Sequence, residues 1–381
     1  MRIALAALAA LAVAMGIGRF AFTPILPMMQ ADAGLSMAAG SWLASANYFG
    51  YLIGALSAIN LRLRPFTAIR AGLLAIGLST LAMGLEHDFF VWVAMRLVAG
   101  IASAWVLVFV SAWALERLAA LGRPQMSGVV YAGVGAGIAV AGGACLLLMR
   151  LHADSSSAWL SLGIAALAVT ALLWNFFDRE IGASVTASPA APAAPELKGK
   201  SWLLVLAYGI YGYGYIIPAT FLPAMAREAI ADPGLFGWAW PAFGAAAVAS
   251  TLFASRLTRF MSPRAIWIAC HLVMALGVAM PVLVPGLAGI LLASLLVGGT
   301  FVVITQVGLQ EARAVAGARA RPLMAAMTSA FALGQIVGPL SATWLAGIQG
   351  SVPGGAHEHF QRPLIVAAAL LALSALALLR R

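Results

Sequence analysis

Two arginines lie inside long apolar runs and are the residues of this sequence best suited to chemistry. Arg19 follows the stretch ALAALAALAVAMGIG, and Arg96 lies within FFVWVAMRLVAGIASAWV. A guanidinium group is a planar fork of N–H donors that matches the oxygen atoms of a carboxylate or phosphate. The 12 acidic residues fall in loops or at the ends of apolar runs, so we expect none beside either arginine. The pair therefore predicts either a site for a small organic anion or two side chains that bond helix carbonyls and hydroxyls.

Polar and aromatic residues at helical spacing are the other candidates for a binding site. Residues four apart share one face of a helix, and several polar residues have this spacing or interrupt apolar runs. Each of them, taken singly, is more typical of helix packing than of binding. As a cluster around one cavity they predict a lining. The candidate substrate-binding residues are Arg19, Arg96, Asn47, Tyr51, Tyr211, Tyr215, Gln306 and Gln335.

The composition places these residues in a membrane. Of 381 residues, 63% are hydrophobic and only 9% are charged, whereas a soluble globular chain has about 25% charged residues. A soluble enzyme, a nucleic-acid-binding domain and a disordered chain are therefore excluded as the main body. Cys145 and Cys270 both lie in apolar runs, so no disulfide framework is expected.

An apolar run of about 20 residues can cross a bilayer as a helix. We therefore predict an all-α polytopic membrane protein with twelve transmembrane helices. The first run continues to Met29, which is too long for the apolar region of a cleaved signal peptide, so we expect it to be retained. The predicted helices are residues 3–30, 37–61, 66–85, 89–116, 124–149, 156–177, 201–226, 234–255, 264–285, 287–311, 320–348 and 361–381.

The basic residues predict the orientation, because Lys and Arg accumulate in cytoplasmic loops. With twelve helices, both termini and the even-numbered loops share one side, which carries 17 of the 22 basic residues. The other side carries only Arg150, Arg227 and Arg362, and the remaining two are Arg19 and Arg96. We therefore expect a multi-pass protein of the bacterial inner membrane with cytoplasmic termini. The net charge of +10 then reflects topology rather than a nucleic-acid partner.

The chain reads as two related halves. Residues 178–200 contain SPAAPAAPELKGK and predict a cytoplasmic linker between six-helix bundles at 1–177 and 201–381. The pattern Gly-x-Gly at 16–18 and Leu-Pro at 26–27 recurs 196 residues later, at 212–214 and 222–223. Such a parallel duplication is typical of transporters that bind their substrate between the two halves.

Glycines are spaced so that helices can approach closely. The patterns are Gly133-x-x-x-Gly137 and Gly334-Gln335-x-x-Gly338-Pro339. Spacing of this kind predicts packing or gating positions. Together with Arg96-x-x-x-Gly100, these segments resemble motifs B and C of the major facilitator superfamily. GIGRFAFTPILP, LASANYFGYLIGA, YGYGYIIPATFLP and FALGQIVGP are similar to its YbfB/YjiJ-type subfamily of bacterial transporters.

This resemblance implies a central cavity lined by helices 1, 4, 7 and 10 and opened to each side in turn. No nucleotide-binding G-x-x-x-x-G-K-[ST] motif is present. We therefore expect a secondary transporter of a small molecule, more specifically an organic anion, that is monomeric and uses no cofactor or metal. The alternatives are a proton-coupled drug or metabolite exporter and a transport-inactive membrane sensor. An intramembrane enzyme is not expected, since no H-E-x-x-H pair or paired intramembrane aspartates occur.

Overall fold

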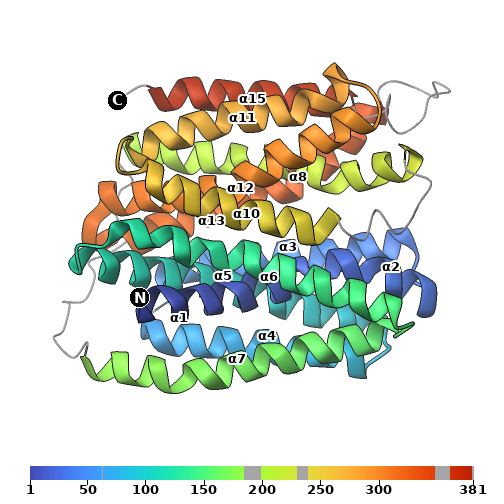
Figure 1. Ribbon diagram of the computed structural model, residues 1–381, viewed down its shortest axis with the longest axis horizontal. Coiled ribbons are helices and arrows are strands. Elements are labelled where there is room, and N and C mark those ends of the chain that lie inside the picture. Colours follow the sequence, from blue (N-terminus) through green and yellow to red (C-terminus); the bar gives the residue numbers. More distant parts are fainter. Residues whose placement is uncertain (62, 184–198, 230–238, 348–360, 380–381) are drawn as a thin grey trace.

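The computed structural model describes residues 1–61, 63–183, 199–229, 239–347 and 361–379, and the described part is helical throughout its length between short connections. Successive helical segments run antiparallel, so that α1 begins and α15 ends at the same end of the molecule (Figure 1). We call this end the terminal face. Each of the twelve predicted runs overlaps a helical stretch of the described residues, and the first run covers α1, η1 and α2 together, which confirms the all-α fold.

The first half contains α1 (Arg2–Leu11), the π-helix η1 (Ala12–Phe20), α2 (Phe22–Asp32), α3 (Met37–Asn60), α4 (Pro65–Leu85), α5 (Phe89–Ala120), the 3-10 turn η2 (Pro124–Met126), α6 (Ser127–Arg150) and α7 (Ser155–Ala183). The second half contains α8 (Gly199–Ala229), α10 (Ala239–Leu257), α11 (Pro263–Leu283), α12 (Leu287–Ala316), the 3-10 turn η3 (Gly317–Arg319), α13 (Ala320–Gly347) and α15 (Gln361–Leu379).

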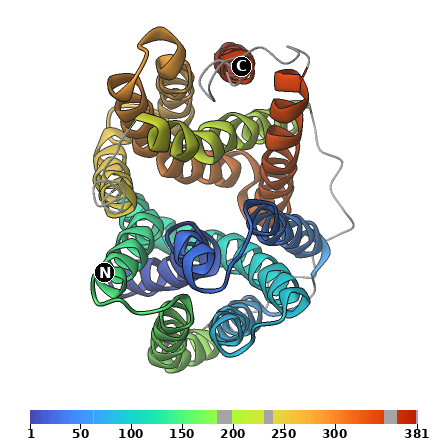
Figure 2. The ribbon, with the colours of Figure 1, turned by 90° about the vertical axis from the view of Figure 1, so that its right-hand side faces the viewer.

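The two halves form two groups of helices that lie side by side (Figure 2). The largest packing surfaces between them are those of α3 with α13 and of α6 with α10. Ten of the segments in the described residues are long and apolar enough to cross a membrane by length and hydropathy alone, and α3 and α10 are not among them. α3 and α10 are both at the junction of the halves, where they pack against α13 and α6.

The predicted first helix is continuous but not uniformly α-helical. Its middle third, Ala12–Phe20, is a π-helix that contains Gly16, Gly18 and Arg19. π-Turns are rare in proteins as a whole, but those that occur often lie at functional sites. The sequence analysis did not predict this segment, because a π-turn leaves no periodic signature in nine residues.

The predicted linker at 178–200 falls mostly on residues 184–198, which lie outside the described residues. Its first part, residues 178–183, continues α7, and α8 begins at Gly199. The division of the chain at this point stays a prediction.

Candidate functional site

Arg19 lies in the interior of the bundle, where the two halves meet. Its side chain is 3% exposed and projects from the end of the π-helix η1. One terminal nitrogen, Nη2, donates to Oε1 of Gln335, which lies on α13 in the other half. The two remaining nitrogens, Nε and Nη1, have no hydrogen-bond partner. A buried guanidinium with unused donors is unfavourable unless another group supplies acceptors.

No carboxylate neutralises this charge within the described part of the chain. The ion pairs there join Arg264 to Glu311 at 3.8 Å and Arg313 to Glu116 at 3.9 Å, all near the terminal face. The partner of Arg19 is instead the neutral amide of Gln335, whose own Nε2 is buried without a partner. Three buried nitrogens of this pair, Nε and Nη1 of Arg19 and Nε2 of Gln335, therefore have no acceptor.

Arg96 is equally buried but has a different environment. Its Nη1 donates to the carbonyl of Gly18 and its Nη2 to the carbonyl of Arg19, both at 3.4 Å. The ring of Phe22 covers the guanidinium carbon at 4.7 Å. The side chain of Arg96 thus holds the main chain of η1, whereas the side chain of Arg19 has donors to spare.

Asn47 supports the same segment. Its Nδ2 donates to the carbonyl of Gly18 at 3.2 Å and to that of Arg96 at 3.0 Å, while Oδ1 has no partner. Ser103 on α5 adds a bond from Oγ to the carbonyl of Ala14 at 2.8 Å. The π-helix is therefore fixed by side chains from α3 and α5, which is how inserted polar groups stabilise irregular helical turns.

Aromatic rings surround the guanidinium of Arg19. Its carbon lies 4.0 Å from the ring centre of Tyr51, 5.5 Å from that of Tyr48 and 5.7 Å from those of Phe20 and Phe331. Attraction between a cation and a ring face replaces part of the lost hydration of the charge.

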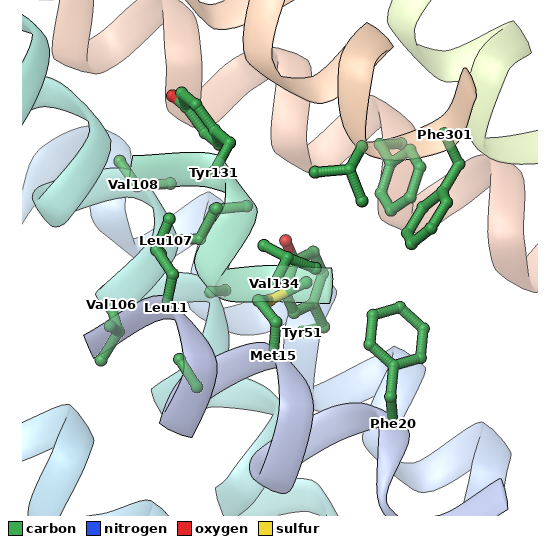
Figure 3. Close-up of a cluster of buried hydrophobic side chains, with 14 of the residues drawn as sticks. Leu11, Met15, Phe20, Tyr51, Val106, Leu107, Val108, Tyr131, Val134 and Phe301 are labelled. Carbon is green, nitrogen blue, oxygen red and sulfur yellow. The ribbon is translucent and has the colours of Figure 1, made fainter. Parts of the chain in front are cut away.

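A small cavity lies beside this cluster. Its volume is about 20 Å³, enough for about one water molecule. Figure 3 shows Met15, Phe20 and Tyr51 of the first half facing Phe301 of the second. The cavity is closed, and an organic substrate would fit only after the surrounding rings move apart. Its lining residues are Met15, Phe20, Tyr51, Leu107, Val134, Tyr208, Tyr211, Phe301, Val302, Thr305 and Phe331.

The remaining predicted lining residues lie at different places. The hydroxyl of Tyr211 donates to the carbonyl of Phe301 at 2.6 Å and lies 3.1 Å from Oγ1 of Thr305. The ring of Tyr215 stacks on Phe301 with centres 5.2 Å apart, but Tyr215 does not line the cavity. Gln306 is fully buried on α12, and neither its Oε1 nor its Nε2 has a partner.

Apart from Tyr51, sequence reasoning missed the aromatic residues that contact Arg19. Phe20 is the neighbour of Arg19 in the chain, and Phe331 precedes Gln335 by four residues. That spacing puts Phe331 and Gln335 on one helix face, and it could have identified Phe331. Tyr48 and Phe301 carried no comparable signal, because their partners lie on other helices.

The predicted glycines lie at close helix contacts. A Cβ on Gly133 would lie 2.1 Å from the carbonyl oxygen of Leu8, and one on Gly334 would lie 2.3 Å from that of Gly209. Gly137 faces Ala12, and Gly338 faces Ile216. Each of these contacts joins two helices of the same half: Gly133 and Gly137 in the first half, Gly334 and Gly338 in the second. Pro339 lies inside α13 next to Gly338.

A second face of α6 makes the contact between halves. There a Cβ on Gly135 would lie 2.6 Å from the carbonyl oxygen of Gly244 on α10. Sequence reasoning did not single out this pair. In the described residues, no group of three or more His, Cys, Asp or Glu could hold a metal ion.

Comparison with known proteins bears directly on this arrangement. A family model described as uncharacterised MFS-type transporter YbfB matches residues 11–379, nearly the whole chain. The resemblance expected from the sequence is thereby confirmed. No curated protein matches the chain.

Proposed function

Because the chain belongs to the YbfB-type family of major facilitator superfamily transporters, we propose that it is a secondary transporter that moves a small organic anion across the membrane by alternating access. The protein is a multi-pass membrane protein of a transporter family. The anion, the mechanism, the inner-membrane location and the cytoplasmic position of the terminal face are parts of the proposal.

One observation carries the choice of an anion. Arg19 is buried at the junction of the halves with two unused N–H groups, and a third unused group belongs to its partner Gln335. A carboxylate would supply the acceptors that these donors lack and would neutralise the charge. The ordered side chains of the cavity include no acid that would favour a cationic drug.

The position of the site supports alternating access. Arg19 and Gln335 belong to opposite halves, so an anion bound to both would contact both halves at once. Such a ligand is released when the halves separate on one side, which is the arrangement expected of a duplicated transporter.

Uptake by purified protein in proteoliposomes tests the proposal, with a panel of radiolabelled small carboxylates and cationic dyes. We expect carboxylate uptake by the unmodified protein and a loss of about thirtyfold or more in Arg19→Gln, because a buried carboxylate left without its charged partner costs about 2–5 kcal/mol. Arg259→Gln changes an exposed arginine of the terminal face and serves as the matched control. Unchanged carboxylate uptake by a folded Arg19→Gln variant would refute the anion site.

A further inference from the structure

The surroundings of Arg19 restrict the chemistry of the transported anion beyond its charge. The two buried guanidinium groups differ in the nitrogens that they leave unpartnered. Both terminal nitrogens of Arg96 bond to carbonyls of η1 and its Nε has no partner, whereas Arg19 has an unpartnered terminal nitrogen, Nη1, as well as an unpartnered Nε. Arg19 is therefore the group with a terminal nitrogen to offer, and one such group matches one carboxylate.

Most of the unpartnered polar atoms beside Arg19 are donors. Oε1 of Gln335 already accepts a bond from Arg19, and its Nε2 has no partner. With Nε and Nη1 of Arg19, this gives three nitrogens with unused N–H groups, against one unpartnered acceptor in the same region, Oδ1 of Asn47. A carboxylate accepts several hydrogen bonds and donates none when ionised, so it matches this set.

The cavity lies beside Arg19 and Gln335, neither of which lines it, and its wall is mostly apolar and aromatic surface. Of its hydroxyl groups, those of Tyr211 and Thr305 bond to each other or to the carbonyl of Phe301, and the other two belong to Tyr51 and Tyr208. The rings of Phe20, Tyr51 and Phe331 lie against both the guanidinium and the cavity. The part of the ligand that extends away from its carboxylate therefore meets ring faces and edges.

Aromatic pairs are favoured in stacked or edge-to-face arrangements, and the cluster contains both. The ring of Tyr215 stacks on Phe301 with centres 5.2 Å apart, and Phe20 meets Phe301 edge-on at 6.1 Å. These contacts join rings of opposite halves or of different helices. A planar ring that entered between them would replace contacts of the same kind, whereas a saturated chain would not.

We propose that the substrate is an aromatic monocarboxylate, whose carboxylate binds Arg19 and Gln335 and whose ring lies among Phe20, Tyr51 and Phe331. This inference depends on the proposed function and narrows its substrate class. Since the cavity holds about one water in this structure, the ligand enters only when the rings of the two halves separate.

Binding and counterflow with the full-length purified protein in lipid nanodiscs and proteoliposomes test this inference with four probes. The probes are benzoate, cyclohexanecarboxylate, phthalate and benzamide, which vary the ring, the charge and the carboxylate one at a time. We expect benzoate to bind at least three- to tenfold more tightly than cyclohexanecarboxylate. We also expect phthalate and benzamide to bind more weakly than benzoate.

Three variants connect the result to the structure. Phe331→Leu is expected to weaken benzoate about three- to tenfold and to leave cyclohexanecarboxylate unchanged. Phe253→Leu removes a ring that is 65% exposed and is the matched control. Arg19→Gln is expected to abolish binding of both carboxylates.

The outcomes separate the two proposals. Equal affinity for benzoate and cyclohexanecarboxylate would overturn the aromatic class, and equal affinity for phthalate would overturn the monoanion; either result leaves an anion transporter intact. Failure of every carboxylate in the uptake panel would overturn the proposed function itself.

Discussion

Gln335 occupies the place beside Arg19 where an acid would form a buried ion pair. The amide satisfies one donor and leaves the charge uncompensated. This makes Arg19 available to a ligand, because a resident carboxylate would compete with any incoming anion. The neutral partner is thus as important to the proposed site as the arginine.

Gln335→Glu tests this competition. The new carboxylate is expected to pair with Arg19, to lower the affinity for carboxylates at least tenfold and to raise the melting temperature in detergent, because a close charge pair replaces an unpaired charge. Gln335→Leu, which removes the amide without adding a charge, should weaken binding without raising the melting temperature. Unchanged affinity in Gln335→Glu would contradict the interpretation.

The two buried arginines should differ in their effect on folding. Arg96→Leu leaves the carbonyls of Gly18 and Arg19 without their donors, and we expect the free energy of unfolding to fall by about 1–3 kcal/mol. Arg19→Leu removes a charge with unused donors and should cost less. Thermal unfolding of both variants in the same detergent compares them, and equal destabilisation would refute the division of roles.

The sequence identified both arginines but could not distinguish them. Their burial followed from apolar flanks, which are alike for Arg19 and Arg96. Their partners depend on how η1, α3 and α5 approach one another, and this is a tertiary property. The aromatic shell was missed for the same reason, since Tyr48 and Phe301 reach Arg19 or its neighbours only across helix interfaces.

At the scale of helices, α6 uses glycines on two faces for two purposes. Gly133 and Gly137 bring it close to the first helix of its own half, whereas Gly135 brings it close to α10 of the other half. Helix positions were predicted well from apolar runs. Which face of each helix packs against which neighbour was not predicted, because nearly every face of such a helix is apolar and the hydrophobic periodicity does not single one out.

Gly135→Ala is expected to force α6 and α10 apart and to destabilise the protein by about 1–3 kcal/mol, since the added Cβ meets main-chain atoms that cannot rotate away. Gly143→Ala on the same helix is the control, because a Cβ there meets nothing within 4 Å. Thermal unfolding should leave Gly143→Ala unchanged or slightly more stable. Equal melting temperatures for both variants would contradict the close contact.

At the scale of the whole molecule, polar bonds join the halves near the terminal face. Arg313 on α12 pairs with Glu116 on α5, and Gln310 donates to Oγ of Ser127 at 2.5 Å. The two halves are therefore in contact on this side of the molecule. Since the exposed pair contributes only about 0.2–1 kcal/mol, it can hold the halves together without locking them.

Glu116→Gln should favour a state in which the halves separate at the terminal face. The population of that state, relative to the one described here, should rise by up to about fivefold. Spin labels on the exposed residues Leu121 and Phe260 of opposite halves would report the longer distance by double electron–electron resonance. Glu311→Gln breaks the pair with Arg264 inside the second half and is the control. An identical distance distribution in Glu116→Gln and the unmodified protein would contradict a gating role.

The uncompensated charge of Arg19 also has an electrical consequence. A carrier loaded with a monoanion differs from the empty carrier by one elementary charge, and a membrane potential acts on a charge with up to about 2.3 kcal/mol per 100 mV. Voltage would therefore act differently on the loaded and empty reorientation steps. Exchange of one anion for another uses the loaded step alone, whereas net uptake needs both. Electrical recording would therefore distinguish exchange from net uptake, whereas a radiolabel measures only the total amount of anion that enters.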